Sequence, residues 1–174
     1  MNLDLNEVYN LLDLPDPALL DRVTARVEWV VEKLSKANIV IATPVLNFDL
    51  KGATAGYAYN RDNRVRLNLD LLNRNTEDFI DKMIPHEIAH LAAFKYFPDD
   101  RPHGRAWQLI MDGVLNIPAE RCHQFDTEGF VYDCACAKGC KVGPIVHRRI
   151  QENYKFYRCR VCKLSLVQLR EDRE

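Results

Sequence analysis

Two histidines flank a glutamate in the stretch His86-Glu87-Ile88-Ala89-His90. On an α-helix, residues four apart are separated by about 400° around the axis and by roughly 6 Å along it. Both imidazoles therefore point the same way and can bind one zinc ion. The glutamate beside the first histidine can take a proton from a zinc-bound water. The pattern predicts a hydrolytic zinc site, provided that a third ligand exists elsewhere in the chain.

A catalytic zinc ion needs three protein ligands and one open position for water. The candidates for the third ligand are His103, His123, His147 and nearby acidic residues. His103 is the best of them, because it follows a short loop that can fold back beside the motif helix. Gly104 after it permits a close approach of the backbone. The alternative is that the two motif histidines are ordinary surface residues of a helix.

These groups together suit the hydrolysis of an amide bond. Zinc lowers the pKa of its bound water toward neutrality and polarises the carbonyl under attack. Glu87 accepts the proton of that water and can pass it to the leaving amine. The sequence therefore predicts a zinc metallopeptidase with Glu87 as its catalytic base.

Four cysteines in two close pairs form a second candidate metal site. One pair is Cys134 and Cys136, and the other is Cys159 and Cys162. In a reducing compartment this spacing favours a metal over disulfides. Four thiolates suit a tetrahedral, structural zinc ion, whose binding stabilises a segment too short to have a large core. The spacing predicts a zinc ribbon, with Cys140 as an alternative ligand in place of Cys134 or Cys136.

Positive charge is concentrated at the C-terminal end of the chain. Residues 131–174 hold ten Lys and Arg against five Asp and Glu, whereas the rest of the chain holds 14 and 20. Basic side chains among aromatic ones suit a nucleic-acid strand, through phosphate pairing and base stacking. The candidate contacts are Arg148, Arg149, Lys155, Arg158 and Arg160. The alternative is that these charges are the solvated face of a small zinc module.

Three helices are predicted before the cysteines. Apolar residues at three- and four-residue steps, after Asp16 and Pro17, predict a helix to about residue 37. A second helix from residue 75 or 76 to about 97 carries the histidine motif, and Pro85 is expected to bend it. A third helix is predicted over residues 103–115, with a buried side formed by Trp107, Ile110, Met111, Val114 and Leu115.

Short apolar or alternating runs predict the strands. In the N-terminal part they are residues 39–41, 45–48, 56–59 and 65–69, and the last two form a hairpin of a small antiparallel sheet. Residues 142–150 and 154–158 are predicted as strands between the cysteine pairs.

Length and composition fit a cytoplasmic protein. The chain has 174 residues, of which 47% are hydrophobic, so a core can form. No apolar run is long enough to span a bilayer, and the first ten residues lack the basic and apolar regions of a signal peptide. We expect no membrane association and no nucleotide cofactor.

The motif histidines, followed after twelve residues by His103-Gly104-x-x-Trp107, resemble the SprT family of zinc metalloproteins. Residues 56–58 with 63–68 are similar to a strand pair of that family, and residues 122–125 lie where the family has a His-Gln-Phe segment. The paired cysteines are similar to its C-terminal ribbon. The resemblance covers roughly residues 18–170.

The resemblance implies an α+β fold in two domains. The first, over residues 1–128, is a minimal zincin-like metalloprotease domain with helices and a small antiparallel sheet. It carries a catalytic zinc on His86, His90 and His103, with Glu87 as base. The second, over residues 129–174, is a zinc ribbon with a structural zinc.

The family is related to the eukaryotic protease Spartan, which degrades proteins covalently trapped on DNA. The resemblance therefore implies a protease of DNA-associated or DNA-crosslinked proteins, with single-stranded or damaged DNA as a partner. One alternative is a non-catalytic nucleic-acid-binding or adaptor protein with structural zinc. Another is a peptidase with no nucleic-acid role.

Overall fold

The computed structural model describes residues 14–121, 125, 129–137, 139–152 and 157–166. The chain divides into two compact units, residues 1–126 and residues 127–174. Each unit combines helices with a small sheet, so the fold class is α+β, as predicted. Within the described ranges, no helix is both long enough and apolar enough to cross a membrane.

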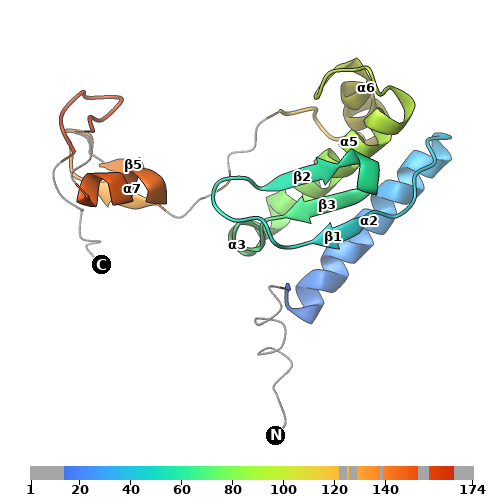
Figure 1. Cartoon of the computed structure of the whole chain (residues 1–174), viewed down its shortest axis with the longest axis horizontal. Helices are drawn as coiled ribbons and strands as arrows, with labels where there is room; N and C mark the ends of the chain where they lie inside the picture. Colours follow the sequence, from blue (N-terminus) through green and yellow to red (C-terminus); the bar gives the residue numbers. More distant parts are fainter. Residues whose placement is uncertain (1–13, 122–124, 126–128, 138, 153–156, 167–174) are drawn as a thin grey trace, which may run out of the picture. The chain divides into compact units, whose positions relative to one another are not determined.

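The first unit contains a sheet of three short strands in the order β1-β3-β2 (Figure 1). They are β1 (Val45–Asn47), β2 (Gly56–Tyr59) and β3 (Arg64–Leu67). The β2–β3 pair is the predicted antiparallel hairpin, closed through η1 (Asn60–Asp62). The expectation of a purely antiparallel sheet is wrong, because β1 pairs with β3 in parallel. Alternation in the sequence shows which residues are buried, but it does not show which strand lies alongside.

The predicted strand at residues 39–41 is also wrong. The Ile39 N–H bonds to the Leu34 carbonyl and so closes the end of the preceding helix. The backbone of Val40 is bonded by side chains: its N–H donates to the Tyr96 hydroxyl at 2.9 Å, and its carbonyl accepts from Lys95 at 2.8 Å. These bonds replace the ladder that a strand would need.

The long helix α2 (Pro17–Lys36) begins where predicted. The Asp16 carboxylate accepts a hydrogen bond from the Leu19 N–H at 3.0 Å, which satisfies one of the unpaired donors at a helix start. Figure 1 shows α2 and α5 behind the sheet. The apolar side of α2 is buried in the core of the unit through Leu19, Val23, Val27, Val30 and Leu34.

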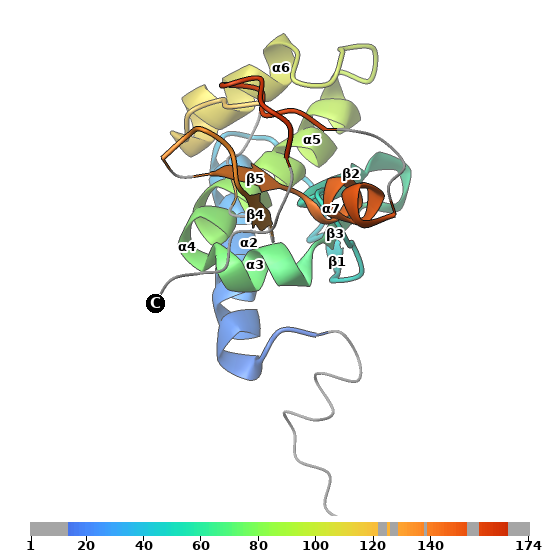
Figure 2. The same ribbon diagram turned by 90° about the vertical axis from the view of Figure 1, so that its left-hand side faces the viewer.

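The segment from residue 69 to residue 96 is almost entirely helical. Figure 2 shows it rising from α3 through α4 and α5. Its elements are α3 (Leu69–Arg74), α4 (Thr76–Asp78), the π-helical turn η2 (Phe79–Met83) and α5 (Ile84–Tyr96). Helix α3 was not predicted from the sequence. The Asn68 side chain caps its first turn by accepting a hydrogen bond from the Leu71 N–H at 3.2 Å.

The irregularity expected at Pro85 takes the form of η2. In this turn the Ile84 N–H reaches back five residues to the Phe79 carbonyl. Pro85 has no N–H to give to the Asp81 carbonyl, four residues earlier. Arg26 of α2 donates to that carbonyl instead, at 2.8 Å.

The third helix starts two residues later than predicted. It consists of α6 (Arg105–Gln108) and a π-helical continuation, η3 (Leu109–Leu115). Of its predicted buried side, Trp107, Ile110, Met111 and Leu115 are buried, and Val114 is only partly buried. His103 lies in the turn before the helix.

The second unit contains an antiparallel pair of strands, β4 (Phe130–Tyr132) and β5 (Cys140–Val142). The predicted strand over residues 142–150 is wrong beyond Val142, because residues Pro144–Gln151 form helix α7. Gly143 is extended and Pro144 takes the first helical position, where a proline is well tolerated. Of the predicted strand 154–158, residues 154–156 lie outside the described residues, and Arg158 forms an isolated bridge with Ser165.

Candidate metal centres

Helix α5 presents two imidazoles on one face. His86 and His90 are one turn apart, and their Nε2 atoms lie 3.2 Å from each other. His86 is buried, and His90 is partly exposed. The four-residue spacing therefore brings the two rings together as predicted from the helical repeat.

His103 completes a cluster of three imidazoles. Its Nε2 lies 3.0 Å from that of His86 and 3.1 Å from that of His90. The residue sits in the turn before α6 with φ of 56°, in the left-handed region. Of the alternative third ligands, His147 belongs to the second unit, and His123 lies outside the described residues.

The spacing of the three nitrogen atoms fits one zinc ion. Zinc–nitrogen bonds of about 2.0–2.1 Å in a tetrahedron place two nitrogens about 3.3 Å apart, close to the separations observed. Burial, followed by the charge of His103, lowers the pKa of His90 to about 4. Burial, followed by the charge of Arg121, also lowers the pKa of His103. Both rings are therefore neutral near pH 7, which is the form that binds metals.

Trp107 contacts all three histidines of the cluster. Its indole N–H donates to the His86 carbonyl at 3.2 Å. The centroid of its ring lies 4.8 Å, 5.5 Å and 4.7 Å from the ring centroids of His86, His90 and His103, respectively. The periodicity predicted that Trp107 is buried, but its contact with every imidazole is visible only in the structure.

Glu87 points into the unit, beside the edge strand β2. It is 5% exposed, and burial raises the pKa of its carboxyl to about 8. The Ala58 N–H bonds to this carboxylate, which acts in the opposite direction on the pKa. Gly56 also lies against it. Gly56 is the first residue of β2, and a glycine lets another group approach the backbone closely.

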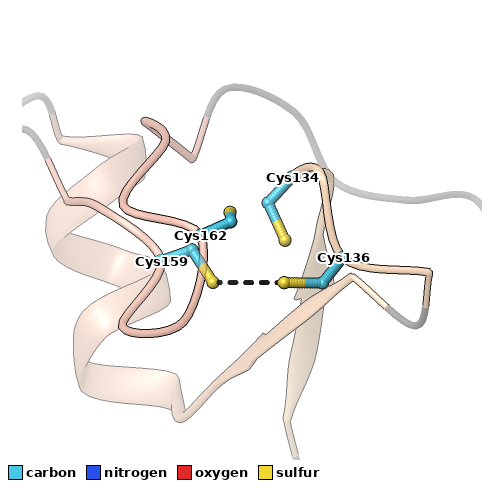
Figure 3. Close-up of side chains that lie close together, drawn as sticks. All are labelled: Cys134, Cys136, Cys159 and Cys162. Atoms are coloured by element: carbon cyan, nitrogen blue, oxygen red, sulfur yellow. Dashed lines mark hydrogen bonds between the residues drawn. The ribbon is translucent and has the colours of Figure 1, made fainter.

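The second cluster consists of four thiols in the second unit (Figure 3). The sulfur atoms of Cys134, Cys136, Cys159 and Cys162 all lie within 4.8 Å of one another. Cys136 and Cys159 are 3.8 Å apart, which is the edge of a tetrahedron with zinc–sulfur bonds of about 2.3 Å. The donor set and spacing fit a closed zinc site.

The turn after Cys159 lowers the pKa of its thiol and so favours the thiolate, which is the form that binds metals. The N–H groups of Cys162 and Val161 bond to the Cys159 sulfur and lower the pKa of this thiol to about 6. Cys140 on β5 is not one of the four clustered thiols, and burial raises its pKa. Among the described residues, the geometry therefore selects the pair at 134 and 136 over the alternatives that include Cys140.

The predicted nucleic-acid contacts lie in two places within the second unit. Arg148 and Arg149 are exposed on α7. Arg158 and Arg160 are exposed on either side of Cys159. Lys155 lies outside the described residues. These residues belong to the second unit, whereas the histidine cluster belongs to the first, and their contact with nucleic acid stays a prediction.

The fold and the two clusters define a class: an α+β protein with one group of three histidines and one group of four cysteines that could each hold a metal ion. The model of the SprT-like family matches residues 25–123. Protein SprT of Proteus mirabilis (strain HI4320) is 36% identical over 149 residues, which cover 80% of this chain and 89% of the relative. Protein SprT of Escherichia coli O157:H7 is 37% identical over 145 residues, 78% of this chain and 87% of the relative.

The chain belongs to the SprT-like family. Protein SprT of Actinobacillus succinogenes is a further relative, 35% identical over 130 residues that cover 70% of this chain and 74% of the relative. No solved structure matches the chain. The zincin-like fold that the family resemblance implies therefore stays a prediction.

Proposed function

We propose that this protein is a zinc-dependent peptidase in which Glu87 is the catalytic base. One observation carries the proposal: three imidazole nitrogens converge to within 3.2 Å, and the residue next to one of them is a buried glutamate. A purely structural metal site has no need for an acidic side chain held away from water, because burying a carboxylate costs free energy.

His86, His90 and His103 would hold the catalytic zinc. When bound, zinc polarises a carbonyl and lowers the pKa of water, which is the chemistry that amide hydrolysis needs. Only three side chains converge here among the described residues, so the donor set leaves room for a further ligand. The four cysteines would hold a second, structural zinc.

Glu87 lies next to a candidate zinc ligand, His86, and its carboxyl is buried, as suits a general base. Its carboxylate accepts the Ala58 N–H, which fixes its orientation against β2. A zinc ion on the three imidazoles would favour the ionised form of this carboxyl, which can then take the proton from the attacking water and deliver it to the nitrogen of the leaving amine. Gly56 leaves space for the carboxylate, since a side chain at that position would meet it.

The proposed substrates are proteins bound or crosslinked to DNA, and the second unit is the proposed DNA contact. Residues 157–166 contain three basic residues and no acidic one. Two exposed apolar side chains neighbour them in the sequence, Val161 at 81% and Leu164 at 54%. Exposed arginines beside apolar groups can pair with phosphates and pack on unstacked bases of a single strand.

Metal removal and replacement test the peptidase proposal. The full chain, loaded with zinc, is expected to cleave an unfolded protein such as casein, and single-stranded DNA is expected to increase the rate. Removal of zinc with a chelator should abolish cleavage, and zinc should restore it. His103→Ala should remain inactive after zinc is added. Absence of cleavage by the zinc-loaded chain, with and without DNA, contradicts the proposal.

A non-catalytic DNA-binding or adaptor protein is the second candidate, favoured by the exposed arginines of α7. Anisotropy of a labelled single-stranded oligonucleotide measures the binding. Replacement of Arg148 and Arg149 by alanine should weaken it and reduce the slope of log affinity against log salt by about two. Arg22→Ala on α2 is the matched control. Tight binding without any peptidase activity selects the second candidate.

A further inference from the structure

The third histidine of the cluster is held by a loop rather than by a helix. Residues 97–104 connect α5 to α6, and His103 lies next to the end of this loop. Its φ of 56° is uncommon for a residue with a side chain. The helical repeat fixes the distance between His86 and His90, but it has no such effect on His103. Some other contact must set the position of this imidazole.

The Asp100 carboxylate makes a hydrogen bond that joins the residues before and after His103 in the sequence. Its Oδ2 accepts from the Ala106 N–H at 2.8 Å. Ala106 is the second residue of α6, and its N–H is a donor that the side chain of the N-cap residue normally satisfies. The N-cap residue here is Gly104, which has no side chain. The acceptor is therefore the side chain of Asp100, four residues before the N-cap residue.

Gly104 is needed for space and not for its backbone conformation. Its φ of −73° is open to any residue. A Cβ at this position would clash with Asp100 Oδ1 and would lie 2.5 Å from its Cγ. The carboxylate of Asp100 thus occupies the place where an ordinary capping side chain would lie.

Two further bonds complete the turn around the histidine. The Gly104 N–H donates to the Arg101 carbonyl at 2.8 Å. The Gln108 side chain donates to the His103 carbonyl at 3.0 Å. Each of these two bonds holds one side of His103. The Asp100 bond instead links the loop before His103 to the first turn of α6 after it.

We propose that Asp100 is a positioning residue of the three-histidine site. Its carboxylate bonds to the Ala106 N–H and is not part of the three-histidine group, and it acts by holding the turn that carries His103. The inference rests on the metal-binding part of the proposed function and not on peptide hydrolysis. Supporting residues around metal ligands typically change metal affinity by about 10–100-fold. Because Asp100 acts through the backbone, we expect the low end of that range, about tenfold.

The test compares zinc affinity, measured by chelator competition, with the Co²⁺ absorption spectrum of the full chain. Asp100→Ala should weaken binding at the histidine site about tenfold and change the spectrum of Co²⁺ bound there. Asp100→Asn keeps an oxygen acceptor and should behave nearly as the wild type. Asp99→Ala is the matched control, since Asp99 is exposed and makes no side-chain bond among the described residues.

A double variant separates positioning from simple helix capping. In Asp100→Ala/Gly104→Ser, the introduced serine can cap α6 locally, in the space that the carboxylate leaves. Thermal stability should recover toward that of the wild type, but zinc affinity should not. Full recovery of affinity, or an unchanged affinity in Asp100→Ala, overturns the inference. A wild type that binds zinc without cleaving any protein contradicts the proposed function alone.

Discussion

The carboxylate of Glu87 occupies the space that a side chain at Gly56 would fill. A Cβ on Gly56 would lie 2.8 Å from both Cγ and Oε1 of Glu87, and 2.8 Å from the Met83 sulfur. The two residues belong to neighbouring elements, β2 and α5. The absence of a side chain on the strand is therefore what allows the proposed base to be buried beside it.

Gly56→Ala is expected to reduce peptidase activity while leaving zinc content unchanged. The added methyl group must displace the Glu87 side chain, and a shift of about 1 Å at a catalytic group can cost about 100-fold in rate. Zinc analysis and the rate of cleavage, measured on the same sample, provide the check.

Gly113→Ala is the matched control for that variant, because nothing lies within 4 Å of a Cβ at Gly113. It should keep full activity. Equal activities of the two glycine variants would show that Glu87 tolerates the displacement or has no catalytic role.

Trp107→Phe should destabilise the protein and weaken zinc binding. The phenyl ring keeps some of the contacts with the imidazoles but cannot donate to the His86 carbonyl. The loss of one buried hydrogen bond costs roughly 1–3 kcal/mol. Denaturant unfolding and chelator competition measure the two effects. Trp29→Phe, on α2, is the control and should leave zinc affinity unchanged; a similar loss in both variants would contradict a specific role for Trp107.

Replacement of single cysteines distinguishes ligands from bystanders in the second unit. Cys136→Ser should lose one zinc per chain, because its sulfur lies 3.8 Å from that of Cys159 within the cluster. Cys140→Ser should retain both zincs. Metal analysis by mass spectrometry of the intact protein gives the count. Loss of a zinc from Cys140→Ser would return Cys140 to the ligand set.

The sequence predicts those parts of the site that depend on local periodicity. His86 and His90 converge because a helix repeats every 3.6 residues, and His103 is within reach because its connection is short. The two cysteines within each pair lie close together for a similar reason, since each pair comes from one short segment. These features needed no knowledge of how distant segments pack.

The remaining features depend on contacts between segments or on competing local signals. The parallel partner of β1 and the bonds of Lys95 and Tyr96 to Val40 are tertiary choices that no periodicity records. In α7, the apolar β-branched residues suggested a strand, but Gly143 and Pro144 start a helix. For the contact between Gly56 and Glu87, the sequence offers only a weak signal, a glycine at the start of a strand.

The most direct test of the central claim is the cleavage rate of Glu87→Gln at full zinc occupancy. Glutamine has the size of glutamate and can still accept the Ala58 N–H, but it cannot take a proton from water. We predict an unchanged zinc content of two per chain and a fall in kcat/KM of about 100- to 10,000-fold. A zinc-loaded Glu87→Gln variant that cleaves protein at the wild-type rate would contradict the account.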